Sequence, residues 1–513
     1  MDLGYNLNER KSGKSDPEME YTMNFENRTL FIADNLDIMR GMDSGTVDLI
    51  YLDPPFKSGK QWKAPIGSPA EGAEFKDIWT DEDIKYEWHG VIADEHEELY
   101  QIIQASEVVY DKSMRIYLTA MAVRLFEMHR ILKPTGSIYL HCDPTASHYL
   151  KALMDALFGS DNFRNEVIWK RTSTKSLAKR YAVNTDRILY YIKSNGATWN
   201  QQYAPYEAEY IQKTFRGQDK HGKYGTVDLS GGKAGSKRAY MPLKGIEPPP
   251  GRAWAPPARN KFPASAQALL PDNYETLDQL SKCEVLDDAG LLHWPKGKIG
   301  RPRWKKYLSA MPGVVAGDLV LDTPPVKGKE DTGYPTQKPL ALLERIIKAS
   351  SNKEDMVLDP FCGCATACVA AERLHRKWVG IDISPDAEDI TKLRLSDEVN
   401  KTANLFNPLA DVIVRKDAPE RTDNAEEIAI QRHLPRYQTH KPELFGRQQG
   451  KCNGCQYPFH YRNLTVDHIT PQSKGGTDHI ENLQLLCAAC NSTKGQGTQA
   501  ELISRLKEQG VLK

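Results

Sequence analysis

The sequence predicts an α/β fold: a doubly wound sheet that carries an irregular insertion and is followed by a small separate domain. Three observations predict it. Strand-like apolar runs alternate with helical periodicity over residues 24–195, and the alternation returns over 331–400. The residues between, 196–330, are rich in Pro, Gly, Trp and basic side chains and show little periodicity. The tail, 441–513, carries two CxxC pairs and follows a polar stretch, 401–440, which we expect to be a linker.

The composition is typical of a globular protein of about two to four domains. Lys+Arg and Asp+Glu both total 68, so the net charge is zero. Only a local excess of basic residues could therefore indicate binding to nucleic acid. No apolar run approaches the ~18–20 residues that a membrane span needs, so no membrane partner is expected. Residues 1–23 lack the apolar core of a secretory signal and are expected to be a flexible leader. The cysteine pattern does not resemble a disulfide framework, which favours the cytoplasm.

The predicted elements follow one another along the chain with turn-forming residues between them. Residues 47–52, VDLIYL, form a short apolar run that stops at Asp53-Pro54-Pro55, as a buried parallel strand stops at a loop. Helical periodicity over 114–132 ends at Lys133-Pro134. The remaining predicted elements are strands over 137–143, 186–193, 356–359 and 378–384, and helices over 339–350 and 366–375.

The first chemical motif is Asp53-Pro54-Pro55-Phe56, at the end of a predicted strand. The exocyclic amine of a base is a poor nucleophile because its lone pair is delocalised into the ring. The Asp53 carboxylate and the carbonyl that precedes Pro55 can each accept one N–H, which draws the nitrogen toward tetrahedral geometry. The prolines fix the loop without adding a donor, and Phe56 can stack on the base. A purely structural Pro-Pro turn is the alternative.

The second motif runs from Asp359 to Thr366, DPFCGCAT, between a predicted strand and a helix. Small residues let the backbone approach a ligand, and the N-terminus of the helix lies beside it. Asp382 ends the next predicted strand, where a carboxylate can accept both hydroxyls of a ribose. A generic tight turn between strand and helix is the alternative.

Together these residues resemble the amino-methyltransferases of DNA in the beta order of motifs, over roughly residues 24–400. The catalytic motif comes first, then the basic insertion, then TGYPTQKP at 332–339, and finally the motif at 359–366. TGYPTQKP is the most specific string. The order argues against methylases of ribosomal RNA or of protein glutamine, in which the cofactor motif usually comes first. The resemblance implies a Rossmann-like core, S-adenosylmethionine as cofactor and double-stranded DNA as substrate.

The resemblance also assigns roles position by position. The target amine is assigned to Asp53, Pro54, Pro55 and Phe56, and the cofactor to Asp34, Thr336, Lys338, Asp359, Phe361, Gly363 and Asp382. Within the second set, Thr336 and Lys338 are expected near the methionine end of the cofactor. Asp34 matches an acid that reads its adenine, with a surface turn aspartate as the alternative. Ala365 stands where the family usually has a second glycine, and we expect a slightly altered loop that still binds.

The insertion takes the place of the family's target-recognition domain. Its basic residues are interleaved with Trp254, Trp294, Trp304 and Tyr307, which suits phosphate and base contacts, although a solvated irregular insertion is the alternative. The target base must leave the duplex, so base flipping is implied. Asp53, rather than the Ser of many cytosine-N4 enzymes, favours adenine N6 over cytosine N4. Enzymes with this motif order often dimerise, and a homodimer is expected.

The tail contains a predicted zinc site. The two thiolate pairs are Cys452 with Cys455, and Cys487 with Cys490. Four thiolates form a closed tetrahedral zinc site of the structural kind. Such a site helps a domain of this size to fold.

Between and after the thiolate pairs, the tail resembles the HNH (ββα-metal) nucleases over about 452–495. By that resemblance His468 is the general base that activates water, and Asp467 ligates Mg²⁺ or a similar divalent cation. Asn482 would orient the loop that carries His468. Asn491 occupies the third signature position, often His, and can offer a carbonyl ligand to the cation.

The sequence thus predicts a DNA methyltransferase fused to a nuclease, in a restriction–modification or phage-related setting. Two alternatives stay open. The chain is a pure modification enzyme whose zinc tail only grips DNA, or its methylase acts on RNA. Nuclease activity that depends on His468 would exclude a tail that only binds DNA. Methyl transfer to duplex DNA rather than to RNA would exclude an RNA methylase.

Overall fold

The computed structural model describes residues 23–57, 61–65, 68, 70, 74–172, 181–232, 236–295, 300–385, 388–395, 412–423 and 436–512. The predicted leader lies outside these residues except at Met23. Contacts divide the chain into one unit of residues 1–200 and 318–513 and a second of 201–317. Over the described residues, no helix has both the length and the apolar character required to cross a membrane.

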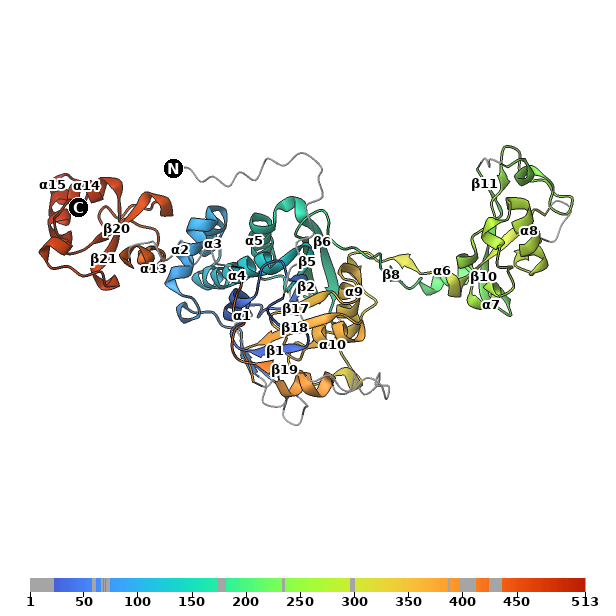
Figure 1. Ribbon diagram of the computed structural model, residues 1–513, viewed down its shortest axis with the longest axis horizontal. Coiled ribbons are helices and arrows are strands. Elements are labelled where there is room, and N and C mark those ends of the chain that lie inside the picture. Colours follow the sequence, from blue (N-terminus) through green and yellow to red (C-terminus); the bar gives the residue numbers. More distant parts are fainter. Residues whose placement is uncertain are drawn as a thin grey trace. The chain divides into compact units, whose positions relative to one another are not determined.

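A mixed nine-stranded sheet forms the centre of the first unit. Its order is β16 (Leu319–Val320), β6 (Phe163–Lys170), β7 (Thr185–Ile192), β5 (Leu132–Cys142), β2 (Val47–Leu52), β17 (Met356–Asp359), β18 (Lys377–Asp382), β1 (Thr29–Ile32) and β19 (Ile413–Arg415). The run from β5 to β19 is parallel, whereas β7 is antiparallel to both of its neighbours. Figure 1 shows β2, β17, β18 and β1 side by side. The predicted α/β class is confirmed.

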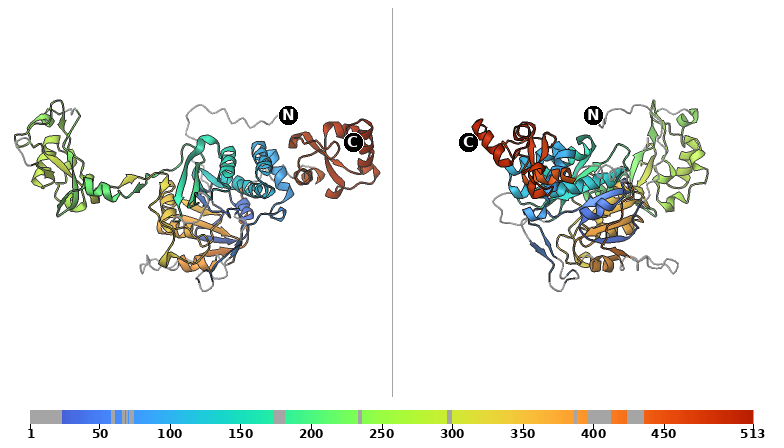
Figure 2. Two further views of the ribbon diagram at one scale, coloured as in Figure 1. Left: turned by 180° about the vertical axis from the view of Figure 1, so that it is seen from behind. Right: turned by 60° about the vertical axis from the view of Figure 1, so that its left-hand side comes forward.

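Helices cover both faces of this sheet, as a doubly wound fold requires (Figure 2). One face packs on α1 (Asn35–Gly41), α4 (Lys112–Ile131) and α5 (Ser147–Phe158), and the other on α9 (Leu340–Ser350) and α10 (Thr366–Arg373). Successive side chains of a strand point to opposite faces, so both faces of β2 must be apolar. Ile50 and Leu52 accordingly enter the first core, and Leu49 and Tyr51 the second.

Two strand pairs bring distant segments to one edge of the sheet. β2 and β17 pair in parallel, with Leu49 opposite Val357. β1 and β18 also pair in parallel, and Ile32 lies opposite Asp382. Since the carboxyl ends of parallel strands share an edge, the loops after all four strands converge there.

Part of the stretch expected as a linker, 401–440, belongs to the sheet. Ile413–Arg415 form β19, which pairs in parallel with β1. Thr422 then donates from its backbone N–H and its hydroxyl to the Asp43 carboxylate, both at 2.7 Å. The rest of this stretch lies outside the described residues, apart from 412–423 and 436–440.

The second unit has its own small sheet and core. The sheet has the order β13 (Leu292–His293), β14 (Arg303–Tyr307), β10 (Gly222–Asp228) and β9 (Gly217–Asp219). The other strands and helices of the unit are β8 (Tyr203–Ala204), α6 (Ala208–Thr214), β11 (Ser230–Gly231), β12 (Ala253–Trp254), α7 (Ala264–Gln267), α8 (Gln279–Asp288) and β15 (Val314–Val315). The insertion therefore folds around a core of its own.

Two of the four aromatic residues that suggested base contacts, Trp254 and Tyr307, are buried in the core of the second unit. Trp254 is 1% exposed and donates its indole N–H to the carbonyl of Met241, and Tyr307 is fully buried. Trp304 is partly buried against the same core, and the indole N–H of Trp294 donates to Asp287. Large aromatic rings occupy cores and binding surfaces alike, so the residue pattern could not distinguish the two.

Several basic residues of the insertion also serve its own fold. The Arg259 guanidinium donates to the carbonyls of Gln267 and Leu270. Arg238 pairs with Asp278 at 3.1 Å. Some of the basic residues counted in the sequence are therefore already engaged within the unit. Lys233, Lys296 and Lys298 lie outside the described residues.

The C-terminal domain packs on a helical pair that comes early in the chain. The domain contains α13 (Lys441–Arg447), β20 (Leu464–His468), β21 (Leu483–Cys487), α14 (Ala488–Lys494) and α15 (Gln499–Glu508). The helical pair is α2 (Tyr86–Glu95) and α3 (Glu97–Val109), which follows the short hairpin of β3 (Gln61–Lys63) and β4 (Glu74–Lys76). Ala93 of α2 belongs to the core of the C-terminal domain.

Two glycines allow α2 and α13 to pack closely. A Cβ at Gly446 would lie 2.0 Å from the carbonyl oxygen of Tyr86, and one at Gly90 would lie 2.2 Å from Cα of Pro442. Beside this crossing, the rings of Tyr100 and Phe445 lie 5.5 Å apart between their centres. The contact is therefore a packed apolar interface.

Gly446→Ala should destabilise this interface, because the new methyl group requires the helices to separate. Overpacking of this kind costs about 1–3 kcal/mol, which lowers Tm by about 3–8 °C. Thermal unfolding by circular dichroism measures the change. Gly317→Ala is the matched control, since a Cβ there meets open space. Equal melting temperatures for the two variants would contradict the close packing.

A second prediction concerns pH, because α2 buries His89 at 4% exposure. Burial lowers the pKa of His89 to about 4, and the charge of Arg115 acts in the same direction. The unfolded chain, with an ordinary His pKa of about 6.5, therefore binds the proton first as the pH falls. The contribution of neutral His89 to the free energy of unfolding is complete above about pH 6.5 and decreases progressively toward pH 4. At pH 5 the free energy of unfolding is lower by about 2 kcal/mol on this account.

Urea unfolding of the wild type and of His89→Gln at pH 7.5 and pH 5.0 isolates this contribution from that of other histidines. Between pH 7.5 and pH 5.0 the free energy of unfolding should decrease by about 2 kcal/mol less in the variant than in the wild type. An identical loss in both proteins would show that His89 does not titrate in this way.

Candidate active site

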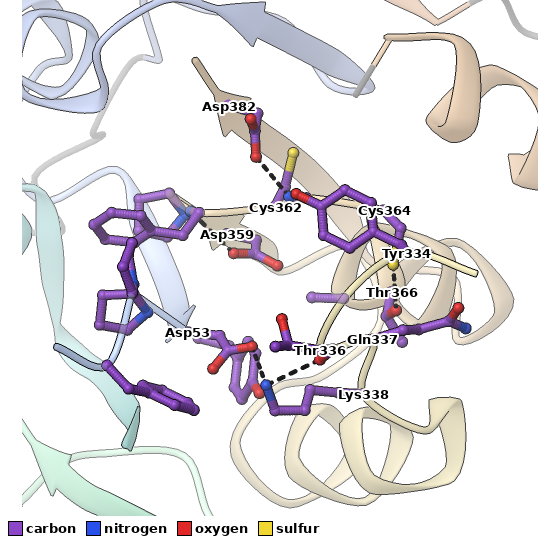
Figure 3. Close-up of a pocket in the computed structure, with 18 of the residues that line it drawn as sticks. Asp53, Tyr334, Thr336, Gln337, Lys338, Asp359, Cys362, Cys364, Thr366 and Asp382 are labelled. Atoms are coloured by element: carbon purple, nitrogen blue, oxygen red, sulfur yellow. Dashed lines mark hydrogen bonds and ion pairs between the residues drawn. The ribbon is translucent and has the colours of Figure 1, made fainter. Parts of the chain in front are cut away.

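One cavity of about 670 Å³ lies at the carboxyl edge of the central strands. Its walls come from the loop after β2, the loop after β17, the end of β18 and the segment before α9. The predicted residues that line it are Asp34, Asp53, Pro54, Pro55, Phe56, Thr336, Lys338, Asp359, Phe361, Gly363 and Asp382. In Figure 3, Asp53, Thr336 and Lys338 lie at one end of the cavity and Asp382 at the other. Residues assigned to the amine and to the cofactor thus share one cavity.

Asp53 stands at this edge because the apolar strand β2 ends at it. Its side chain is 17% exposed, and its Oδ2 forms an ion pair with Nζ of Lys338. Its Oδ1 is buried and has no hydrogen-bond partner among the described residues. One carboxylate oxygen is therefore neutralised and the other is an unsatisfied acceptor.

Lys338 is held by three groups at once. Besides Asp53, its Nζ donates to the carbonyl of Thr336 at 3.2 Å and lies 5.2 Å from the centre of the Phe56 ring. Thr336 has a φ of +67°, a left-handed conformation that is unusual for a residue other than glycine. The sequence predicted Lys338 near the methionine end of the cofactor and gave no sign of its ion pair with Asp53.

The loop after β17 is bent tightly by two left-handed residues. Gly363 has a φ of +49°, and a Cβ there would lie 2.9 Å from the Tyr334 ring. Ala365, the departure from the family pattern, has a φ of +56° and precedes α10. The backbone of Ala365 thus adopts a conformation that glycine adopts more easily.

Two carboxylates hold this loop in shape. Asp359 is buried, which raises its pKa well above the usual value, and it accepts the backbone N–H of Phe361 at 3.2 Å. Asp382 accepts the backbone N–H of Gly363 at 2.7 Å and that of Ser384 at 2.8 Å. Small residues, a helix N-terminus and an acid at the end of the next strand fit the ribose and amino-acid parts of S-adenosylmethionine.

Asp34 lines the cavity and also has structural partners. It caps α1 by accepting the backbone N–H of Leu36 at 2.8 Å. It also pairs with Arg124 of α4 at 3.1 Å. Its assignment to the adenine of the cofactor stays a prediction.

A buried polar chain that the sequence did not reveal lies behind the loop after β2. The hydroxyl of Tyr51 is 2.8 Å from Nδ1 of His141, and Nε2 of His141 is 3.3 Å from Asp186. Burial acts to raise the pKa of Asp186, but the hydrogen bond and charge of His141 bring it below its usual value. The His141 ring stacks on Phe56 with 5.9 Å between centres. The chain therefore supports the residue expected to stack on the base.

The four tail cysteines meet as predicted for a metal site. Cys452, Cys455, Cys487 and Cys490 place their sulfur atoms within 4.8 Å of one another. The sulfur of Cys452 accepts backbone N–H groups of Gly454 and Cys487, both at 3.3 Å. Such donors favour a thiolate, so this donor set fits a tetrahedral zinc ion.

His468 ends β20 and has a carboxylate partner that the sequence analysis missed. Its Nε2 is 2.7 Å from Asp478, and this hydrogen bond lowers the pKa of Asp478 below its usual value. A carboxylate that accepts from Nε2 leaves Nδ1 as the basic nitrogen. The segment GGTDH, between the predicted base and Asn482, is the only sequence signal for this partner.

Asp467, the predicted cation ligand, is already paired on one oxygen. Its Oδ2 lies 3.1 Å from Nζ of the buried Lys494 and accepts from Gln484 at 2.9 Å. Asn491 donates through its Nδ2 to Thr465, so its carbonyl oxygen remains the ligand atom. A carboxylate oxygen and an amide oxygen suit Mg²⁺, although Lys494 already neutralises part of the carboxylate charge.

Asn482 fastens the loop that follows His468. Its side-chain oxygen accepts the backbone N–H of Thr470 at 3.0 Å. Its amide donates to the carbonyls of Thr470 and Thr477 at 3.1 and 2.8 Å. These contacts support the orienting role predicted for it.

Two protein families match the chain. The DNA methylase family of the N6/N4 methyltransferases matches residues 47–393. The HNH endonuclease family matches residues 452–497.

Three relatives are similar over most of the methyltransferase part. Type II methyltransferase M.EcaI of Enterobacter cloacae is 28% identical over 376 residues, which are 72% of this chain and 69% of that protein. The type III restriction-modification enzyme StyLTI Mod subunit of Salmonella typhimurium is 29% identical over 70% of this chain and 53% of that protein. DNA adenine methyltransferase YhdJ of Escherichia coli is 23% identical over 70% and 80%.

Solved structures that are similar to the chain are more distant in sequence. The M1.HpyAVI–SAM complex is 16% identical with a TM-score of 0.32, and covers 72% of this chain and 98% of its own. The cytosine-N4-specific PvuII DNA methyltransferase is 12% identical with a TM-score of 0.32, over 73% and 92%.

The two left-handed positions of the loop after β17 predict opposite effects of substitution. Ala365→Gly should raise the free energy of unfolding by up to about 1 kcal/mol, because the strained conformation costs glycine nothing. Gly363→Ala should lower it by about 1–3 kcal/mol, because the new methyl group meets Tyr334. Urea unfolding measures both. Effects of the same sign would show that the backbone of this loop is not as described.

Proposed function

The chain belongs to the DNA methylase family of N6/N4 methyltransferases and carries a C-terminal HNH domain, and on this premise we propose that it methylates adenine N6 in duplex DNA and also cleaves DNA. The observation that carries the first half is Asp53 Oδ1, a buried acceptor with no partner among the described residues, in the cavity that Gly363 and Asp382 line at its other end.

The chemistry at Asp53 is orientation of a weak nucleophile. Asp53 Oδ1 accepts one N–H of the flipped base, and the carbonyl of Pro54 accepts the other. This arrangement directs the nitrogen lone pair away from the ring system. Phe56, which His141 supports, stacks on the base. No covalent intermediate with the protein is required.

The residues at the other end of the cavity hold the methyl donor. S-adenosylmethionine, when bound, supplies a methyl group activated by a sulfonium. Asp382 accepts from its ribose, and the backbone at Gly363 allows its close approach. Phe361 packs beside it. The cavity of about 670 Å³ lies in the range of cofactor sites, about 300–1,000 Å³.

Adenine is the proposed target on two grounds. The motif begins with Asp53, where many cytosine-N4 enzymes have Ser. YhdJ, a relative whose alignment covers 80% of its own length, is a DNA adenine methyltransferase. The similarity to StyLTI Mod, a subunit of a type III restriction-modification enzyme, and to the type II methyltransferase M.EcaI supports a restriction–modification setting for the proposed activity.

The nuclease half of the proposal rests on His468. Its hydrogen bond to Asp478 orients the ring so that Nδ1 can take a proton from water. Asp467 and Asn491 would hold a divalent cation, which when bound stabilises charge on the phosphate. The insertion of 201–317 would recognise the target sequence.

Purified protein on unmethylated plasmid DNA tests both halves at once. The reaction contains Mg²⁺, with and without S-adenosylmethionine. Mass spectrometry of nucleosides follows methylation, and gels follow cleavage. We expect the wild type to form N6-methyladenine. Asp53→Ala should reduce methylation at least about 100-fold and retain cleavage, whereas His468→Ala should abolish cleavage and retain methylation.

Each outcome selects among the alternatives. N4-methylcytosine would replace the adenine assignment, and methylated RNA without methylated DNA would overturn the DNA substrate. Methylation without cleavage in Mg²⁺ or Mn²⁺ would indicate that the C-terminal domain binds DNA but does not cleave it. Ser504→Ala, at an exposed position of α15, is the control for that domain.

A further inference from the structure

We propose that Lys338 is a positioning residue that divides the Asp53 carboxylate, so that Oδ2 is held by the ammonium and Oδ1 alone accepts the target amine. The proposal rests on the proposed function at Asp53. It differs from the role that the sequence predicts for Lys338, which is contact with the methionine end of the cofactor.

The first support is the burial of both partners. Lys338 is 6% exposed, and the Asp53 side chain is 17% exposed. Charges so far from water persist only when they are paired. The ion pair joins two side chains of the protein itself, so it can fix the orientation of the carboxylate without a contribution from substrate.

The second support is the unequal state of the two carboxylate oxygens. Oδ2 receives the ammonium, whereas Oδ1 is buried with no partner among the described residues. Buried acceptors without partners are rare and mark sites of function or strain. A base amine would therefore donate to Oδ1. The ion pair at Oδ2 fixes the orientation of the carboxylate and so the direction from which the amine approaches Oδ1.

The third support is that the ammonium cannot easily move. The carbonyl of Thr336 accepts from it at 3.2 Å, and the Phe56 ring lies beneath it at 5.2 Å. The left-handed Thr336 is followed by Gln337, whose amide donates to the carbonyl of Glu330 and whose oxygen accepts from Thr332. These bonds hold the strained backbone in place, so the segment is a rigid support for Lys338.

A competing interpretation makes Lys338 a placeholder. Its ammonium donates to Asp53 and lies over the Phe56 ring, as the target amine and base are expected to do. A placeholder would have to leave before the base entered, and its removal would help binding. The rigid support and the second, unsatisfied oxygen favour a residue that stays.

Single-turnover methyl transfer to duplex DNA, at saturating S-adenosylmethionine, separates these roles. Lys338→Met removes the charge at similar length, and Lys338→Arg keeps it. Calorimetry measures the affinity for S-adenosylmethionine, and 2-aminopurine at the target position reports base flipping. Lys348→Met, which breaks a surface ion pair of α9, is the matched control.

We expect Lys338→Met to slow transfer by about 100-fold, with the affinity for S-adenosylmethionine changed less than about threefold and base flipping retained. Lys338→Arg, which keeps the positive charge, should transfer the methyl group at least about tenfold faster than Lys338→Met. Adding Lys338→Met to Asp53→Asn should cost little more, because the two residues act as a unit. Calorimetry also shows that each variant is folded.

Three results would overturn the proposal. Loss of cofactor affinity with full rate at saturation would return Lys338 to the cofactor. Unchanged or faster transfer, or tighter DNA binding, would make it a placeholder. Equal losses in the Met and Arg variants would deny a role to the charge. A wild type that binds S-adenosylmethionine but methylates no DNA would instead overturn the proposed function, and this inference with it.

Discussion

The parallel pairing of β2 with β17 is the constraint on which the rest of the methyltransferase part depends. The two strands are about 300 residues apart in the chain, yet Leu49 lies opposite Val357 in the sheet. A shift of this register by one residue would turn every side chain of β2 to the opposite face. Because both faces of β2 are packed, the register is fixed, and so is the position of Asp53 relative to the loop after β17. The cavity is thus a product of strand order as much as of its lining residues.

The predicted site residues of the methyltransferase part line one cavity because several of them end apolar strands. Asp53, Asp359 and Asp382 each follow a run of buried residues, and strand ends in α/β sheets are where ligands bind. The zinc cluster was equally accessible, because CxxC spacing specifies the geometry of the ligands. These features are local in sequence, or depend only on where a strand stops.

Features that depend on side-chain partners could not be predicted. The ion pair of Lys338 with Asp53 joins residues 285 apart, and no pattern in either segment indicates it. The same is true of His141, whose partners come from two other strands. The burial of Trp254 and Tyr307 in the insertion was not predicted, because burial of an aromatic residue cannot be inferred where periodicity is absent. Strand β19 escaped detection because three residues in a polar stretch carry too little pattern.

The interface between α2 and α13 makes the two halves of the chain share a hydrophobic core. Ala93 and Tyr100, from the methyltransferase part, pack among residues that the cysteine cluster organises. If zinc is what folds that cluster, a chain made during metal starvation would leave this apolar surface uncovered. The stability of the helical pair α2 and α3 would then depend on a metal bound in the C-terminal domain.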